Sequence, residues 1–255
     1  MPVSSFENVK LFIGTPTQHG LNSTVYTNSL SSLHYKFGSA GMKIAIGNIT
    51  GSCYVADARN QTVDQFLSTD NTHLLFVDSD IGFNPDYVFH FLHFMEQMPE
   101  CKIMGAQYPK KTIDWDMVIK AVKSGMTAEM LPLIVSEGTV SYLKDENGEP
   151  IPPKSKEEAE RPFEVKELAT GFMMIKREVF ETYQQKYPER LFDKDRWMYF
   201  QCEVMAGQEK YIGDDFFFCR QMRAAGEKIW LCPWMDITHH GMHEFGAPPP
   251  KRLRD

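Results

Sequence analysis

Two aspartates, Asp78 and Asp80, directly follow the apolar residues 74–77 in the segment HLLFVDSD. Such a run predicts a strand buried on both faces of a parallel sheet, and ligands bind at the carboxyl ends of these strands. Two carboxylates at that position repel each other unless a cation joins them, and their oxygens suit Mg²⁺ or Mn²⁺. The pair therefore predicts a divalent metal site. The alternative is a turn capped by Asp78 beside a solvated Asp80.

A second acidic pair, Asp214 and Asp215, lies where a helix over residues 214–225 is predicted to begin. A carboxylate in the first turn is stabilised by the helix dipole by about 0.3–1 kcal/mol, so capping is a serious alternative to chemistry. Two adjacent acids nevertheless exceed what a cap requires. This pair is the second candidate for a chemical role.

Three histidines near the end of the chain, His239, His240 and His243, could supply a further metal ligand. Without the upstream aspartates, a polar edge of the fold would be the better explanation for any one of them. The acidic pair after the buried strand is what makes a histidine ligand worth considering.

The elements that would position these residues alternate between short apolar runs and amphipathic stretches over the first 106 residues, which is typical of βαβ units. The first strand is expected to end at Pro16, which cannot continue a ladder. Strands are predicted at residues 10–15, 42–47, 73–77, 102–106, 163–168, 171–175 and 228–232, and helices at 25–37, 54–67, 85–98, 177–186 and 214–225.

The pattern predicts a single α/β domain over residues 1–255, with a Rossmann-like, mostly parallel central sheet flanked by helices. Residues 109–162 interrupt it as a long irregular insertion, in which the proline-rich and charged stretch 147–161 is expected to be an exposed, mobile loop. Residues 246–255 are expected to form a frayed tail.

The composition excludes several classes of protein. The chain has 255 residues, with 27 Lys and Arg against 34 Asp and Glu, and the net charge of −7 argues against nucleic-acid binding. It contains no apolar run long enough to span a bilayer and no signal-peptide pattern, so we expect a cytoplasmic protein. Its five cysteines are widely spaced and are expected to be reduced thiols. A lone catalytic domain without an anchor favours a bacterial or viral source.

Several segments together resemble GT-A fold glycosyltransferases. The resemblance lies in their order and spacing over residues 10–108 and 165–245, and the intervening loop is unmatched. The segments are GTPT at 14–17, ADARN at 56–60, HLLFVDSDIGF at 73–83, TGFMMI at 170–175, GDDFFFC at 213–219 and THHG at 238–241.

The resemblance implies a GT-A fold with a nucleotide-sugar and metal half over residues 10–108 and an acceptor and catalytic half over 163–245. It implies that Mn²⁺ or Mg²⁺ is bound by Asp78, Asp80 and His239, with His240 as the second choice. Asp215 would be the general base of an inverting enzyme, and Asp214 would orient it. The residues implied to contact the nucleotide sugar are Thr15, Pro16, Asp57, Arg59, Asn60, Asp78 and Ser79.

The function expected from the sequence is metal-dependent transfer of a sugar from a nucleotide-diphosphate sugar, with UDP favoured, to a hydroxyl acceptor on a glycan or other biomolecule. A nucleotidyltransferase is an alternative, disfavoured because residues 14–20 contain no Lys or Arg. A non-catalytic carbohydrate-binding protein is another. Arg59 could instead be a solvated surface residue. Trp197 is a candidate acceptor wall, whereas Trp230 is expected in the core.

Overall fold

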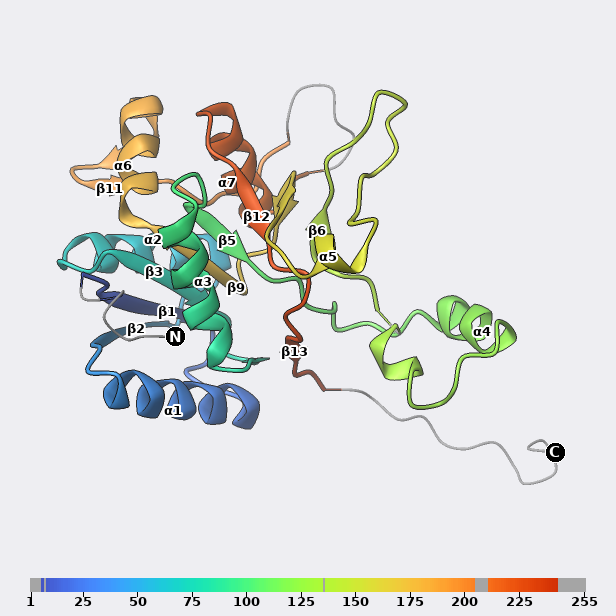
Figure 1. Cartoon of the computed structure of the whole chain (residues 1–255). Coiled ribbons are helices and arrows are strands. Elements are labelled where there is room, and N and C mark those ends of the chain that lie inside the picture. Colours follow the sequence, from blue (N-terminus) through green and yellow to red (C-terminus); the bar gives the residue numbers. More distant parts are fainter. Residues whose placement is uncertain (1–5, 7, 135, 205–210, 243–255) are drawn as a thin grey trace.

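The computed structural model describes residues 6, 8–134, 136–204 and 211–242. Within them a seven-stranded sheet has the order β2-β1-β3-β9-β5-β12-β7 (Figure 1). Most of its strands run in one direction, and only β9 and β7 run against them. The strands are β1 (Leu11–Thr17), β2 (Ile44–Thr50), β3 (His73–Val77), β5 (Ile103–Gly105), β7 (Phe163–Val165), β9 (Phe172–Lys176) and β12 (Ile229–Leu231). The predicted α/β class with a mainly parallel sheet is confirmed.

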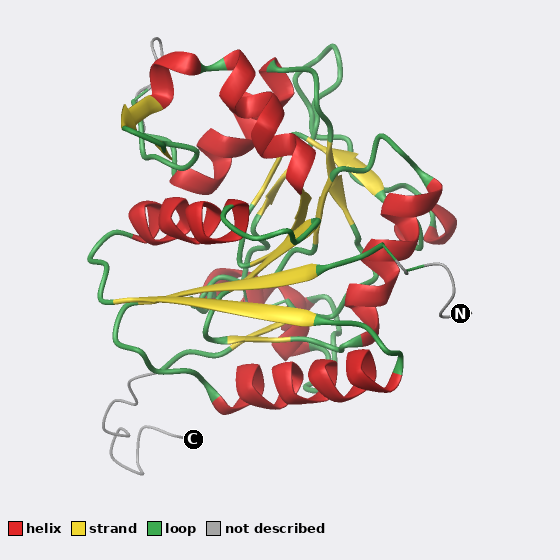
Figure 2. Cartoon of the chain, turned by 90° about the vertical axis from the view of Figure 1, so that its left-hand side faces the viewer, coloured by secondary structure: helices red, strands yellow, loops and turns green. Residues whose placement is uncertain are grey.

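Helices cover both faces of the sheet, as Figure 2 shows. Side chains of β3 alternate between two apolar clusters: Leu75 and Val77 pack in one, Leu74 and Phe76 in the other. This is the alternation that a strand buried on both faces requires. The first cluster includes residues of α1 (Thr24–Ser39) and α3 (Asp86–Gln97), and the second those of α2 (Val55–Leu67), α6 (Arg177–Lys186) and α7 (Asp214–Ala224).

The prediction that the first strand ends at Pro16 is wrong, because β1 extends to Thr17. Its pairing with β3 ends at Gly14, whereas its pairing with β2 continues through Pro16 opposite Ile49. Beyond Gly14 the strand has a partner on one side only, so a residue without an N–H is tolerated there. Residues 15–17 thus lengthen β1 at the carboxyl end of the sheet, where the parallel strand β3 also ends.

The place of β9 could not be read from the sequence. This strand lies between β3 and β5 and runs antiparallel to both. It brings Gly171, which immediately precedes it, beside Asp78, whose backbone N–H donates to the Gly171 carbonyl at 3.0 Å. A segment from the second half of the chain is thus hydrogen-bonded to the backbone of the first acidic pair.

The insertion over residues 109–162 contains α4 (Trp115–Lys123), η2 (Leu131–Leu133), β6 (Val140–Ser141) and α5 (Lys156–Ala159). β6 pairs with β8 (Glu167–Leu168), and a bridge between Pro109 and Gly138 joins the ends of the excursion that carries α4. In Figure 1, α4 lies apart from the sheet. Most of residues 147–161 are exposed, as expected, although Ser155 caps the short α5.

The shorter elements complete the fold. A small two-stranded sheet joins β4 (Ile81–Gly82) to β13 (Thr238–His239), and another joins β10 (Leu191–Asp193) to β11 (Arg196–Trp197), with η3 (Pro188–Arg190) just before it. Trp230 is 9% exposed in β12, which confirms its place in the core. Among the described residues, no helix combines the length and the apolar character needed to cross a bilayer. The cytoplasmic location stays a prediction.

Candidate active site

The first acidic pair lies in a tight turn at the carboxyl end of β3. The Ile81 N–H donates to the Asp78 carbonyl at 3.0 Å, which closes the turn and leads into β4. β13 pairs with β4 so that His239 lies opposite Ile81, and the His240 N–H donates to the Asp80 carbonyl at 2.8 Å. The late THHG segment is therefore attached directly to the aspartate turn.

Both carboxylate oxygens of Asp80 face nitrogen atoms. His239 Nε2 lies 3.3 Å from Oδ1, and the Lys111 ammonium donates to Oδ2. Partial burial alone would raise the pKa of Asp80, but the hydrogen bonds from His239 and Lys111 outweigh it, so the pKa is lowered. Asp80 is thus held as a carboxylate, the form that binds a cation.

The imidazole of His239 is oriented by two contacts. Its Nδ1 lies 2.8 Å from the Pro109 carbonyl oxygen, and its ring meets that of Tyr108 edge-on at 5.1 Å between centroids. Because the carbonyl oxygen can only accept, Nδ1 donates to it, and Nε2 is the ring nitrogen that faces Asp80. Metal-binding histidines are typically held in this way by a second hydrogen bond. Imidazole beside carboxylates is a donor set that fits Mn²⁺ or Mg²⁺.

The predicted set of three ligands is only partly assembled. Asp80 and His239 are in contact, whereas Asp78 Oδ1 lies 3.7 Å from the Arg59 guanidinium. Among the described residues, no group of three or more His, Cys, Asp or Glu side chains is arranged to hold a metal ion. His243, the third histidine candidate, lies outside the described residues. The set of Asp78, Asp80 and His239 stays a prediction.

Arg59 connects the two acidic pairs. It is 5% exposed, and its Nη1 donates to Asp214 Oδ2 at 2.6 Å while Nη2 faces Asp78. Burial alone would lower the pKa of the guanidinium, but the Asp214 and Asp78 carboxylates raise it. The alternative of a solvated surface arginine is therefore wrong. Within the part of the chain that the structure describes, its buried Nε has no hydrogen-bond partner. The predicted nucleotide contact stays a prediction.

The two side chains of the second acidic pair, Asp214 and Asp215, lie in different surroundings. Asp214 is 5% exposed and turns toward Arg59. Asp215 accepts the N–H of Phe216 at Oδ1, 2.8 Å away, and borders a large cleft. Burial raises the pKa of Asp215, with Asp214 adding to the shift and Arg59 opposing it. One acid is thus committed to an ion pair, and the other is available as a base.

The large cleft has a volume of about 1140 Å³ and lies between the insertion and the start of α7. Tyr142, Tyr211 and Phe216 give it aromatic sides, and Lys110 and Glu137 form an ion pair of 2.6 Å at its border. The sequence analysis missed these residues, because nothing in their spacing marks them. Trp197, the predicted acceptor wall, packs against the core instead.

The absence of a side chain at Gly171 lets the start of β9 lie close to Tyr108 and Asp78. The Gly171 N–H donates to the Tyr108 hydroxyl at 3.0 Å, and a Cβ at residue 171 would lie 2.8 Å from Asp78 Oδ2. A larger residue there would displace the carboxylate or the tyrosine. Burial and the nearby Asp78 raise the pKa of Tyr108, so its hydroxyl stays protonated.

A small cavity of about 270 Å³ lies next to the end of β1. Its lining includes Pro16, one of the residues predicted to contact a nucleotide, together with Thr17, Ser52 and Cys53. Asp57, in the first turn of α2, accepts hydrogen bonds from Ser52 and Gln61 near this cavity.

Three other predicted nucleotide contacts have structural partners. Thr15 is fully buried, and its hydroxyl lies 2.7 Å from that of Tyr26. The Asn60 side chain exchanges two hydrogen bonds of 2.9 Å with the backbone of Phe200. The Ser79 carbonyl accepts the N–H of Ser23 at the start of α1. Their nucleotide contacts stay predictions, and the structure accounts for these residues through the fold.

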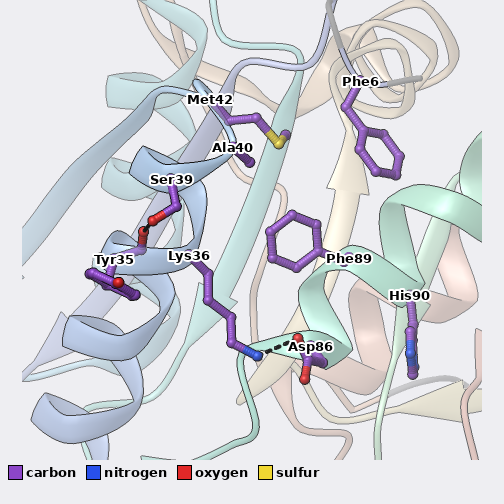
Figure 3. Close-up of a pocket in the computed structure, with 9 residues that line it drawn as sticks. All are labelled: Phe6, Tyr35, Lys36, Ser39, Ala40, Met42, Asp86, Phe89 and His90. Atoms are coloured by element: carbon purple, nitrogen blue, oxygen red, sulfur yellow. Dashed lines mark hydrogen bonds and ion pairs between the residues drawn. The ribbon is translucent and has the colours of Figure 1, made fainter. Parts of the chain in front are cut away.

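A further cavity of about 400 Å³ opens between α1 and α3 (Figure 3). Phe6, Met42 and Phe89 line it, and an ion pair of 2.5 Å joins Lys36 to Asp86 at its side. Met42 precedes β2, so the cavity lies where the parallel strands begin, at the other end of the sheet from Asp78. It contains none of the predicted site residues.

Comparisons with known proteins gave distant structural matches only. No family model and no curated protein matches the chain. A197 from STIV matches at 16% identity with a TM-score of 0.49, over 92% of this chain and 86% of its own. GalNAc-T7, crystallised with UDP, GalNAc and Mn²⁺, matches at 10% identity with a TM-score of 0.47, over 91% of this chain and 43% of its own. S. aureus TarS 1-349 matches at 11% identity with a TM-score of 0.40, over 91% and 60%. Similarity this low leaves the function to be argued from the site residues.

Proposed function

We propose that this protein transfers a sugar from a nucleoside diphosphate sugar, with UDP as the favoured nucleotide, to a hydroxyl group of a glycan or similar acceptor, using Mn²⁺ or Mg²⁺. The observation that carries the proposal is the meeting of Asp78 and Asp214 at the buried Arg59, with Asp80 and Asp215 beside them. Asp214 has a structural role in its pair with Arg59, but the other three carboxylates at this end of the sheet suit a site for a cation and a proton transfer.

The donor side of the site needs a metal. A diphosphate would bring negative charge to a site that is itself rich in carboxylates, in a chain of net charge −7. A divalent cation held by Asp80 and His239, with Asp78 as the third ligand, would join the protein to the phosphates. When bound, the metal would stabilise the charge on the departing diphosphate.

The small cavity supports a nucleotide position at the same end of the sheet as the first acidic pair. It lies at the end of β1, whose last four residues are the segment GTPT, for which the resemblance implies a nucleotide contact. The β2–α2 loop supplies Ser52 and Cys53. The preference for UDP rests on that resemblance.

The acceptor side is the large cleft with Asp215 at its border. Since Oδ1 already accepts the Phe216 N–H, Oδ2 is available to take the proton of an acceptor hydroxyl as its oxygen attacks the sugar. The raised pKa makes this carboxylate a stronger base than an ordinary aspartate. This assignment describes an inverting transfer. Asp214, held by Arg59, fixes the helix start from which Asp215 projects.

Thermal-shift measurements with nucleotide sugars test the proposal, because a ligand that binds only the folded state raises Tm. We expect a UDP-sugar to raise Tm in the presence of Mn²⁺ and to have no effect in EDTA. An equal shift with and without metal would contradict the metal-dependent donor site. A rise in Tm with a nucleoside triphosphate, together with release of its pyrophosphate when a sugar phosphate is added, would favour the nucleotidyltransferase instead.

A further inference from the structure

Lys111, at the start of the insertion, contacts the turn that holds Asp78 and Asp80. Its ammonium donates to Asp80 Oδ2, and its aliphatic chain lies against Gly241, where an added Cβ would meet Lys111 Cδ at 3.1 Å and Cγ at 3.2 Å. Gly241 follows His240, whose N–H binds the Asp80 carbonyl. The lysine is thus packed along the same short segment that delivers His239.

The Lys111 ammonium and a divalent cation would compete for the charge of one carboxylate. A cation held by both Asp80 and His239 would lie at Asp80 Oδ1, so the ammonium on Oδ2 would place a second positive charge on the same group. The Lys111 side chain is 41% exposed, so its ammonium can leave Asp80 without losing contact with water. Its displacement costs little, because ion pairs between lysine and carboxylate at the surface are weak.

We propose that Lys111 is an exchangeable counter-ion of the site. It neutralises Asp80 while no metal is bound, gives way to the divalent cation, and then pairs with the diphosphate that arrives with the metal. This inference rests on the proposed function and assigns a role to the first residues of the insertion, which the sequence left without one. It predicts that Lys111 weakens the binding of the metal and strengthens the binding of the nucleotide.

Titration of Mn²⁺ alone, followed by the electron paramagnetic resonance signal of the free ion, tests the first effect. Lys111→Met is expected to bind Mn²⁺ about three- to fivefold more tightly than the wild type, because the competing ammonium is gone. Lys36→Met is a matched control, since Lys36 is 40% exposed and pairs with Asp86 at the cavity of Figure 3. This control is expected to bind Mn²⁺ like the wild type.

Calorimetric titration of UDP in saturating Mn²⁺ tests the second effect. Lys111→Met is expected to bind UDP about tenfold more weakly, because it loses a charge-assisted contact to phosphate. Unchanged or weaker Mn²⁺ binding by Lys111→Met, or unchanged UDP binding, would overturn the exchange while leaving the proposed function in place. A wild type that binds no Mn²⁺ would overturn both.

Discussion

Two ion pairs in the candidate site differ in their burial and in the parts of the fold that they join. The Arg59–Asp214 pair is buried, with side chains 6% and 8% exposed and a bond of 2.6 Å, whereas the Lys111–Asp80 pair is 41% and 28% exposed. The first joins α2 to α7 across the core, and the second joins the insertion to a turn at the surface.

The difference separates a fixed part of the site from an exchangeable part. Removing one partner of a buried pair leaves an uncompensated charge in a low-dielectric interior, which is strongly destabilising. Removing one partner of an exposed pair leaves a charge that water solvates, at little cost. We therefore expect Arg59 to hold the architecture, and Lys111 to control what binds to it.

The largest effect is expected from Arg59→Met. Asp214 and Asp78 would lose their buried counter-ion, so the free energy of unfolding should fall by about 3–5 kcal/mol in urea denaturation. Lys111→Met should change it by about 1 kcal/mol or less. Similar losses for both variants would show that burial does not distinguish the two contacts.

The two acids that begin α7 differ in the same way, because Asp214 pairs with Arg59 whereas Asp215 borders the large cleft. Asp215→Asn should lower sugar transfer by about 10²–10⁴-fold, because the proton acceptor is removed. It should not lower stability, since burial already disfavours the charged form of this residue. Asp214→Asn should lower stability as well, because it breaks the pair with Arg59. Transfer rates and urea denaturation of both variants separate the two roles, and full activity of Asp215→Asn would remove Asp215 from the mechanism.

His73 has no acidic partner among the described residues, and it shows what burial does to such a group. Burial, with Lys176 adding to it, lowers the pKa of His73 to about 4. The unfolded chain binds this proton near pH 6.5, so stability is lost as the pH falls from about 6.5 to 4, by about 3 kcal/mol.

The expected measurement is the free energy of unfolding of the wild type and of His73→Asn at pH 7.5 and pH 4.5. The wild type should lose about 2–3 kcal/mol more than the variant over this interval. Equal losses would mean that His73 is not the origin of the acid sensitivity.

Local patterns in the sequence predicted the parts of the fold that local physics determines. β3 and α6 have the predicted bounds, and the alternation of β3 between two apolar clusters follows from its uninterrupted apolar run. The family resemblance also implied that the segments around Asp78 and His239 would lie together, and Asp80 and His239 are in contact.

Other features depend on contacts between distant segments. Arg59 is polar and lies mid-helix, a pattern that favours a surface position. Its burial is favourable because Asp214 of α7 and Asp78 after β3 both face its guanidinium. The antiparallel insertion of β9 and the aromatic sides formed by Tyr142 and Tyr211 likewise depend on how distant segments pack. Short-range patterns carry no information on such contacts.

Hydrolysis of a UDP-sugar is the most direct test of the central claim that Asp80 belongs to a metal-dependent donor site. The wild type is expected to release UDP in the presence of Mn²⁺ and to lose this activity in EDTA, while Asp80→Ala is expected to lose it even in Mn²⁺. Its folding can be checked by Tm. If a folded Asp80→Ala variant retained full Mn²⁺-dependent hydrolysis, the account of the site would be wrong.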